Sequence, residues 1–157
     1  PEKPLPNAFV AGGFLFGPGK IVEDVPYDPE LYFYGEEVSV SARLWTHGYN
    51  IYCPNRLLLF HLYKSSGGDG DTSATHWSDH KGWFQLNRRS LVRVHKLLDS
   101  LSIAPTNLNP TPKDIESLDD YGLGTSRRLS DYERMAGISF QSQTINQNAS
   151  AGRFPAD

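Results

Sequence analysis

A glycine pair interrupts an apolar and aromatic segment near the start of the chain, residues 8–16, and this is the strongest local constraint on the fold. The segment predicts a buried strand, and Gly12 and Gly13 mark a point on it where side chains are not tolerated. A backbone without Cβ atoms lets a ligand approach closely and offers its amide groups as donors. A β-bulge or a strand crossing would explain the same pair, and for the glycines alone it is the simpler interpretation.

Residues 36–46 are predicted to form a helix, because Val38, Ala42 and Trp45 recur at spacings of four and three and fall on one face. Gly48 fits the position just after a helix end. The other expectations are a short helix over 20–25, a short strand over 49–53, amphipathic helices over 83–101 and 126–136, a linker over 105–112 and a frayed tail over 141–157.

Two glutamates, Glu36 and Glu37, open the first of these long helices directly after Phe33-Tyr34-Gly35. A carboxylate at a helix entrance can bind sugar hydroxyls or take a proton from an acceptor hydroxyl. The helix dipole alone also favours acids at this position, so a purely structural role stays open. The flanking aromatic residues favour a site, because the apolar faces of sugars stack on aromatic rings.

A histidine, His61, ends the apolar run 57–60, and residues 57–63 are expected to form a buried strand. A neutral imidazole at a strand end is a good metal ligand. A diphosphate bridged by Mn²⁺ would need such a ligand beside carboxylates. The alternative is a histidine that is hydrogen-bonded at the edge of the core.

A polar loop follows at residues 65–75, with Lys64 before it and His76 and Trp77 after it. A lid that carries a cation and an aromatic ring could close over a diphosphate and exclude water. An ordinary solvent loop, docked on the core by Trp77, is an equal alternative. The Asp69-Gly70-Asp71 sequence lies inside this glycine- and serine-rich loop, and we reject it as a metal motif because no hydrophobic strand holds it rigid.

Length and composition narrow the classes of protein. The chain has 157 residues, which fits one domain or the larger part of one. Its net charge of -3 leaves no general basic surface, so no nucleic-acid partner is expected. No apolar run approaches the ~20 residues of a membrane span, so no membrane partner is expected either. A single cysteine, Cys53, favours a cytoplasmic location, and the proline-rich opening, residues 1–6, suggests a fragment of a longer protein.

Taken in order, these pieces resemble the acceptor-side half of retaining GT-A glycosyltransferases. The polypeptide N-acetylgalactosaminyltransferases show a similar order of strand, turn, acidic helix start and metal-binding histidine. The resemblance is closer to the cytoplasmic N-acetylglucosaminyltransferases that act on hydroxyproline and to their bacterial relatives. It covers roughly residues 7–140 and depends on these stretches: Ala11-Gly12-Gly13-Phe14, Tyr27-Asp28, Gly35-Glu36-Glu37, Ser41-Ala42-Arg43-Leu44-Trp45, His61, His76-Trp77, Tyr121-Gly122-Leu123-Gly124-Thr125 and Tyr132-Glu133-Arg134-Met135-Ala136-Gly137-Ile138.

The resemblance implies an α/β fold, the C-terminal part of a GT-A, Rossmann-like nucleotide-diphospho-sugar transferase domain, with a mixed sheet and flanking helices. Residues 1–104 would be its acceptor- and metal-side half, and residues 105–157 a linker, a short helix and a flexible tail. The implied reaction transfers a hexosamine, N-acetylglucosamine, from a UDP-sugar donor to a hydroxyl of a protein (hydroxyproline, serine or threonine) or glycan acceptor, with Mn²⁺ or Mg²⁺ as cofactor. Retention at the anomeric carbon is implied only by the resemblance.

The resemblance also assigns roles to residues. The donor sugar would lie against Ala11, Gly12, Gly13, Tyr34 and Gly35. The catalytic pair would be Glu36, which binds sugar hydroxyls, and Glu37, which lies close to the acceptor. The metal ligand would be His61, and the closing loop would present Lys64, His76 and Trp77 to the diphosphate.

Two departures from the family pattern leave alternatives open. The family's nucleotide-binding half, with its Asp-x-Asp or Asp-x-His motif, is not in the sequence, so this N-terminal half is expected as a partner. Lys64 stands where an arginine is expected, and lysine lacks the bidentate grip of arginine on phosphate. A non-catalytic carbohydrate-binding or scaffold domain is therefore the main alternative. A metal-dependent hydrolase that uses His61 with Glu36 fits less well.

Overall fold

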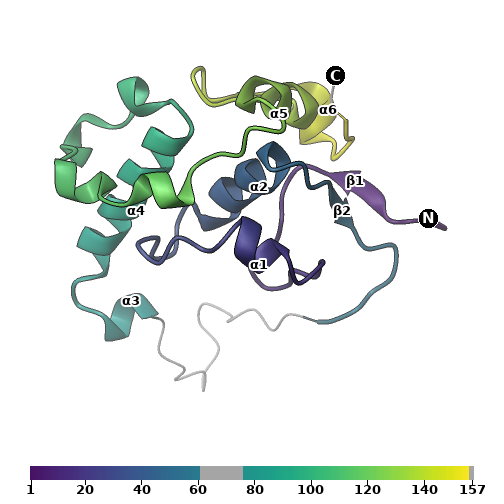
Figure 1. The fold of residues 1–157 in the computed structure, drawn as a ribbon, viewed down its shortest axis with the longest axis horizontal. Coiled ribbons are helices and arrows are strands. Elements are labelled where there is room, and N and C mark those ends of the chain that lie inside the picture. Colours follow the sequence, from purple (N-terminus) through teal and green to yellow (C-terminus); the bar gives the residue numbers. More distant parts are fainter. Residues whose placement is uncertain (61–75, 156–157) are drawn as a thin grey trace, which may run out of the picture.

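The computed structural model describes residues 1–60 and 76–155, and helices make up most of its regular structure (Figure 1). In chain order, the elements are β1 (Leu5–Asn7), α1 (Ile21–Asp24), α2 (Glu36–Thr46), β2 (Ile51–Cys53), α3 (His76–Asp79), α4 (Trp83–Leu97), the 3₁₀ helices η1 (Leu101–Ile103), η2 (Thr106–Leu108), η3 (Pro112–Ile115) and η4 (Leu118–Tyr121), then α5 (Leu129–Ala136), β3 (Ile138–Ser139), β4 (Thr144–Ile145) and α6 (Gln147–Ser150).

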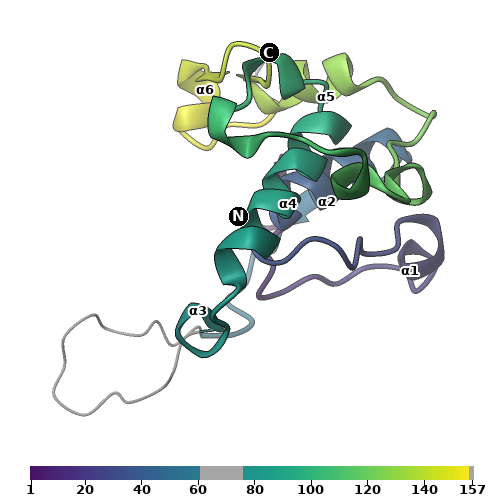
Figure 2. The same cartoon turned by 90° about the vertical axis from the view of Figure 1, so that its left-hand side faces the viewer.

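Helix α2 lies at the centre, with α4 on one side, α5 on another and the β1–β2 pair beside it (Figures 1 and 2). Its predicted face packs on the main core, where Ala42 is fully buried and Val38 and Trp45 are partly buried. Its other apolar residues, Val40 and Leu44, belong to a second buried cluster. Helix α2 is therefore buried on two faces, and its predicted bounds, residues 36–46, are confirmed.

The main core joins the two ends of the chain. The Tyr132 hydroxyl on α5 donates a 2.8 Å hydrogen bond to the Ala8 carbonyl, and both residues are fully buried. The Tyr132 ring also lies edge-on to Phe9 and stacked on Phe140. Residues on both sides of position 104 therefore pack into one core.

The strands of the described residues form two small antiparallel sheets. Strand β1 pairs with β2, with Asn7 opposite Ile51, and β3 pairs with β4, with Ile138 opposite Ile145. Within residues 1–60 and 76–155 there is no larger sheet, so the mixed sheet expected from the family resemblance is not formed there. The strand predicted over 49–53 is confirmed in its second half as β2.

Two segments predicted as buried strands, 8–16 and 57–63, do not form strands where the structure describes them: Ala8 and Val10 are buried, but residues 11–16 and 57–60 are exposed. Residues 11–16 form a turn around an isolated bridge between Ala11 and Phe14, and residues 57–60 have no regular structure. Phe16 is 88% exposed and Phe60 is 89% exposed. An apolar pattern buries a strand only if another element covers it, and no described element covers residues 11–16 or 57–60.

Three further boundaries differ from the predictions. Helix α4 stops at Leu97 rather than residue 101, because Asp99 adopts a positive φ of 51° that ends the helix. Helix α5 begins at Leu129 rather than residue 126, because the amides of Ser126 and Arg127 donate to the Thr46 carbonyl at the end of α2. The tail predicted to fray, residues 141–157, contains β4, which pairs with β3, and α6, which is capped by Asn146.

Candidate functional site

The glycine pair and the acidic pair meet in the structure. The Gly12 amide donates a 2.7 Å hydrogen bond to Glu37 Oε1, across 25 residues of sequence. A Cβ atom at Gly12 would lie 2.7 Å from Glu36 Oε1 and 3.4 Å from Glu37 Oε1. Real Cβ atoms do not approach oxygen to 2.7 Å, so the Glu36 carboxylate would have to move to admit a side chain there, whereas 3.4 Å from Glu37 is an ordinary contact. The glycine pair and the acidic pair, far apart in the sequence, are thus in contact.

A second glycine, Gly35, determines where Glu36 and Glu37 lie. Gly35, the residue before α2, adopts the left-handed conformation with φ of 89°. A Cβ atom there would lie 2.5 Å from Cγ2 of Val94 on α4. Glycine is therefore favoured twice, by its backbone conformation and by the contact with α4. This packing fixes the start of α2, and with it the positions of Glu36 and Glu37.

A serine links the glycine-bearing segment to the same helix. The Ser41 hydroxyl accepts a 2.9 Å hydrogen bond from the Val10 amide and donates to the Glu37 carbonyl. Ser41 is fully buried, so these bonds are shielded from water. The sequence analysis named Ser41 within a stretch of the family resemblance but gave it no role, and only a small polar side chain on a buried helix face could have indicated one.

Charge and burial act together on Glu36. Its side chain is half-buried, and this burial, followed by the nearby charge of Glu37, raises the pKa of Glu36 above the ordinary value of 4.5. The pKa of Tyr27 is raised by its own burial and then by the charges of both glutamates. The site is therefore an acidic centre in which Glu36 binds a proton more readily than an isolated glutamate, which suits a hydroxyl-binding or proton-accepting group.

Aromatic rings lie next to this centre. Phe33 and Tyr34, which directly precede Gly35, are 42% and 50% exposed. The Phe33 ring lies edge-on to Tyr34 at 5.2 Å and to Trp77 of α3 at 5.3 Å between centroids. The structure thus brings Trp77, predicted as part of a closing loop, against the residues that lead into α2.

The remaining predicted site residues divide into two groups. Ala11 and Gly13 are exposed in the turn closed by the hydrogen bond from the Phe14 amide to the Ala11 carbonyl. His61, Lys64 and the side chain of His76 lie outside the described part of the chain.

A metal centre is not complete within residues 1–60 and 76–155, where no three His, Cys, Asp or Glu side chains gather as a candidate ligand set. The predicted ligand His61 is not among these residues. The described residues therefore do not by themselves fit Mn²⁺ or Mg²⁺, and the only carboxylate pair at the site that they supply is Glu36 with Glu37.

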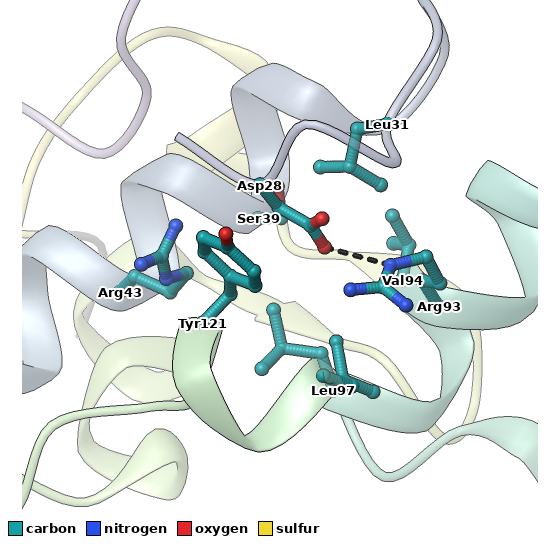
Figure 3. A pocket seen from close by; sticks show the side chains of 9 residues that line it. Asp28, Leu31, Ser39, Arg43, Arg93, Val94, Leu97 and Tyr121 are labelled. Atoms are coloured by element: carbon teal, nitrogen blue, oxygen red, sulfur yellow. Dashed lines mark hydrogen bonds and ion pairs between the residues drawn. The ribbon is translucent and has the colours of Figure 1, made fainter. Parts of the chain in front are cut away.

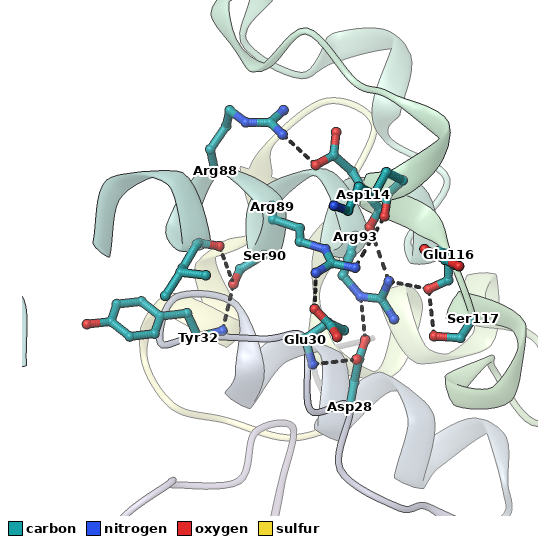
Figure 4. Close-up of polar contacts among 12 residues, drawn as sticks. Asp28, Glu30, Tyr32, Arg88, Arg89, Ser90, Arg93, Asp114, Glu116 and Ser117 are labelled. Atoms are coloured by element: carbon teal, nitrogen blue, oxygen red, sulfur yellow. Dashed lines mark hydrogen bonds and ion pairs between the residues drawn. The ribbon is translucent and has the colours of Figure 1, made fainter. Parts of the chain in front are cut away.

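A buried ion pair behind the site was also missed by the sequence analysis. Arg93 on α4 donates from Nε to Asp28 Oδ2 at 2.8 Å, and these side chains are 0% and 4% exposed (Figure 3). The Arg93 Nη1 donates to the carbonyls of Asp114 and Glu116 (Figure 4). A pair separated by 65 residues leaves no periodic signal in the sequence.

The same face of α4 holds the rest of the loop that precedes the site. Arg89 forms an ion pair with Glu30, and the Ser90 hydroxyl accepts a 2.7 Å hydrogen bond from the Tyr32 amide (Figure 4). Residues 28–32 are therefore fixed to α4 by three polar contacts, which position the aromatic residues and Gly35 that follow.

Among the described residues, no helix is long and apolar enough to cross a membrane.

One of the comparisons with known proteins found a match. The family model described as Glycosyltransferase (GlcNAc) matches residues 1–142, a range that includes the glycine pair, the acidic helix start and α5. No curated protein and no solved structure matches the chain. Because this match covers most of the chain, the chain belongs to the glycosyltransferase (GlcNAc) family.

Proposed function

We propose that this chain carries the acceptor side of an N-acetylglucosaminyltransferase, which moves the sugar from a UDP-sugar donor to a hydroxyl of a protein or glycan. The observation that carries the proposal is the contact of Gly12 with Glu36 and Glu37 in a chain of this family. A backbone without side chains beside two carboxylates lets a sugar approach closely and offers strong acceptors for its hydroxyl groups.

Each part of the site has a proposed role. The turn of Ala11, Gly12 and Gly13 lies against the donor sugar, with Gly35 beside it. Glu36 accepts hydrogen bonds from sugar hydroxyls, and its raised pKa suits it to accept a proton. Glu37, held by the Gly12 amide, faces the acceptor.

The aromatic surface has a separate role. The exposed rings of Phe33, Tyr34 and Trp77 give an apolar sugar face a surface on which to stack. This surface also supports the second candidate function, a domain that binds carbohydrate without transferring it. The closing-loop role of Lys64 and His76 stays a prediction, as does a cytoplasmic location.

We further propose that a divalent cation, Mn²⁺ or Mg²⁺, binds with His61 as one ligand. When bound, it would neutralise the charge that develops on the leaving diphosphate. Mn²⁺ binding can be followed without turnover by the loss of the free-ion electron paramagnetic resonance signal. His61→Ala should weaken this binding, whereas His95→Ala should not, because His95 is engaged with Ser100 on the far end of α4.

The nucleotide-binding half of the family is the partner that we propose for the exposed apolar segments. Leu57, Leu58, Leu59 and Phe60 are between 42% and 89% exposed, and Phe14, Leu15 and Phe16 are similarly open. Single exposed apolar residues are normal on a protein surface, but runs of them such as these suit burial against further strands. Pairing with the nucleotide-binding half would cover them and complete the mixed sheet.

The test is the release of UDP from a panel of UDP-sugars in the presence of Mn²⁺, by the protein that contains both halves. We expect turnover with UDP-N-acetylglucosamine and a loss of about 10²–10⁴-fold in Glu36→Gln. Glu23→Gln, an exposed position on α1, is the matched control and should retain full activity. Sugar binding that persists without UDP release from any donor would establish the carbohydrate-binding alternative.

A further inference from the structure

Two hydrogen bonds attach the segment that carries the glycine pair to α2. The Val10 amide donates to the Ser41 hydroxyl at 2.9 Å, and the Gly12 amide donates to Glu37 Oε1 at 2.7 Å. The two amides lie two residues apart, which is about 6.6 Å in an extended chain. The two accepting residues lie one helical turn apart, about 5.4 Å along the axis. The donors are therefore spaced nearly as the acceptors are, and the longer glutamate side chain takes up the difference.

The two bonds differ in their exposure to water. Ser41 is fully buried and Val10 is 9% exposed, whereas the contact between Gly12 and Glu37 is exposed. Water competes for an exposed hydrogen bond much more than for a buried one. Residues 8–10 lie outside the strands, so no sheet pairs the Val10 amide, and without the serine hydroxyl this buried donor would lose its acceptor. The buried bond therefore holds the segment in place, and the exposed bond depends on it.

The position of this segment determines the surroundings of Glu36. A Cβ atom on Gly12 would lie 2.7 Å from Glu36 Oε1, so the backbone is already in close contact with this carboxylate. Burial is the main cause of the raised pKa of Glu36. If the segment moved away from α2, water would reach the carboxylate and its pKa would fall.

We propose that Ser41 is a positioning residue for the sugar site, and that its buried hydroxyl sets the distance between the glycine turn and the two glutamates. Because Ser41 is fully buried, it contacts neither donor nor acceptor and acts through the Val10 amide. This role rests on the proposed function, since a carboxylate is positioned for a substrate only if the site binds one.

A second buried serine on the same helix provides the matched control. Ser39 is 1% exposed, and its hydroxyl donates to the Glu36 carbonyl at 2.9 Å, as the Ser41 hydroxyl donates to the Glu37 carbonyl. Serine side chains in helices commonly make such bonds to the preceding turn. The bond accepted from Val10 distinguishes Ser41, so a comparison of the two serines separates this bond from the general effect of removing a buried hydroxyl from α2.

The first measurement is the pKa of Glu36, followed by nuclear magnetic resonance of its side-chain carboxyl carbon in folded Ser41→Ala and Ser39→Ala. We expect the pKa to fall toward its ordinary value of 4.5 in Ser41→Ala and to stay unchanged in Ser39→Ala. A merely structural role of Ser41 would lower the stability of the protein but would leave this pKa in place.

The second measurement is UDP release by the protein that contains both halves. Ser41→Ala should lower kcat by about 10–10²-fold, because small displacements of reacting groups are costly, whereas Ser39→Ala should keep the activity of the unaltered protein. Absence of UDP release from the unaltered protein would count against the proposed function alone. The pKa needs no turnover and would still report whether Ser41 positions the carboxylates.

A further variant decides the matter if Ser41→Ala fails to fold. Ser41→Cys keeps a side chain of similar size but replaces the hydroxyl with a weak acceptor, so it should show the same fall in the pKa of Glu36. An unchanged pKa in the Ser41 variant, or an equal fall in Ser39→Ala, would overturn the proposal.

Discussion

The side chain of Val94 occupies the space in which Gly35 would carry a Cβ atom, with Cγ2 2.5 Å from that position. This contact between α4 and the residue before α2 positions the two glutamates that we assign to the sugar site. It also makes Gly35 a test of how tightly the site is coupled to the core, because a side chain there must both strain the backbone and displace α4.

Replacement of Gly35 by alanine should destabilise the protein through both effects. A positive φ costs a residue with a Cβ about 1–2 kcal/mol, and overpacking against Val94 adds about 1–3 kcal/mol. Gly152→Ala is the matched control, because Gly152 has a φ of 67° and nothing within 4 Å of its Cβ position. Urea unfolding of both variants separates strain from packing, and equal losses of stability would show that Val94 moves aside freely.

Replacement of Gly12 by alanine should reduce activity with little loss of stability. The new Cβ would lie 2.7 Å from Glu36 Oε1 and would push the carboxylate out of place, whereas Gly12 itself is exposed and outside the core. Gly19→Ala, with nothing within 4 Å of the added Cβ, controls for the loss of glycine flexibility. UDP release and the unfolding midpoint should be measured together. Full activity in Gly12→Ala would show that the glycine pair is not part of the sugar site.

The titration of Glu36 should depend on Glu37. Burial and the charge of Glu37 raise the pKa of Glu36, so Glu37→Gln should lower it, while Glu23→Gln should leave it unchanged. Nuclear magnetic resonance of the Glu36 side-chain carboxyl carbon measures this directly. An unchanged pKa in Glu37→Gln would mean that the two carboxylates do not interact.

The same raised pKa has a defined effect on stability. In the pH range between the ordinary value of 4.5 and the raised value, the folded state binds more protons than the unfolded state. The contribution of Glu36 is therefore greatest below this range and is lost as the pH rises through it. Glu36→Gln should remove this decline, which a comparison of unfolding free energies across the range will detect.

Removal of the buried carboxylate should be costly. Asp28→Asn leaves the Arg93 guanidinium buried without its counter-charge, and we expect a loss of about 3–5 kcal/mol. Asp131→Asn breaks two ion pairs with the exposed Arg128 and Arg134, and should cost much less, because solvent screens exposed pairs. The free energy of unfolding of both variants can be measured with denaturant, and an equal decrease in the two would contradict this prediction.

The hydroxyl of Tyr132 should contribute to stability through one bond. Tyr132→Phe keeps the ring contacts but leaves the Ala8 carbonyl without this donor, at an expected cost of about 1–3 kcal/mol. Tyr52→Phe, at a ring that is 55% exposed, should have almost no effect. An unchanged thermal unfolding midpoint in Tyr132→Phe would show that water or another donor replaces the hydroxyl.

Local signals predicted the helices well and the sheets poorly. The bounds of α2 follow from its own apolar spacing and from the glycines at its two ends. The start of α5 does not, because Ser126 and Arg127 bond to Thr46, a residue far away in the sequence. The apolar segment 57–60 looks like a buried strand, but no sequence pattern tells whether another element covers it.

The candidate site was predictable only in part. The family resemblance, not spacing, identified Gly12, Glu36 and Glu37 as one site, and the structure confirms that they meet. The bond from Val10 to Ser41 and the pair of Arg93 with Asp28 were missed, because tertiary contacts between single polar residues have no period that could be detected.

The end of α2 has a consequence for how the protein is made. The carbonyl of Thr46 is capped by the amides of Ser126 and Arg127, and its hydroxyl accepts from the Gly124 amide. The helix that presents both glutamates is thus secured by residues synthesised about 80 positions later. We therefore expect a nascent chain still short of residue 127 to hold an unfinished sugar site on the ribosome, which would delay activity until that residue has been added.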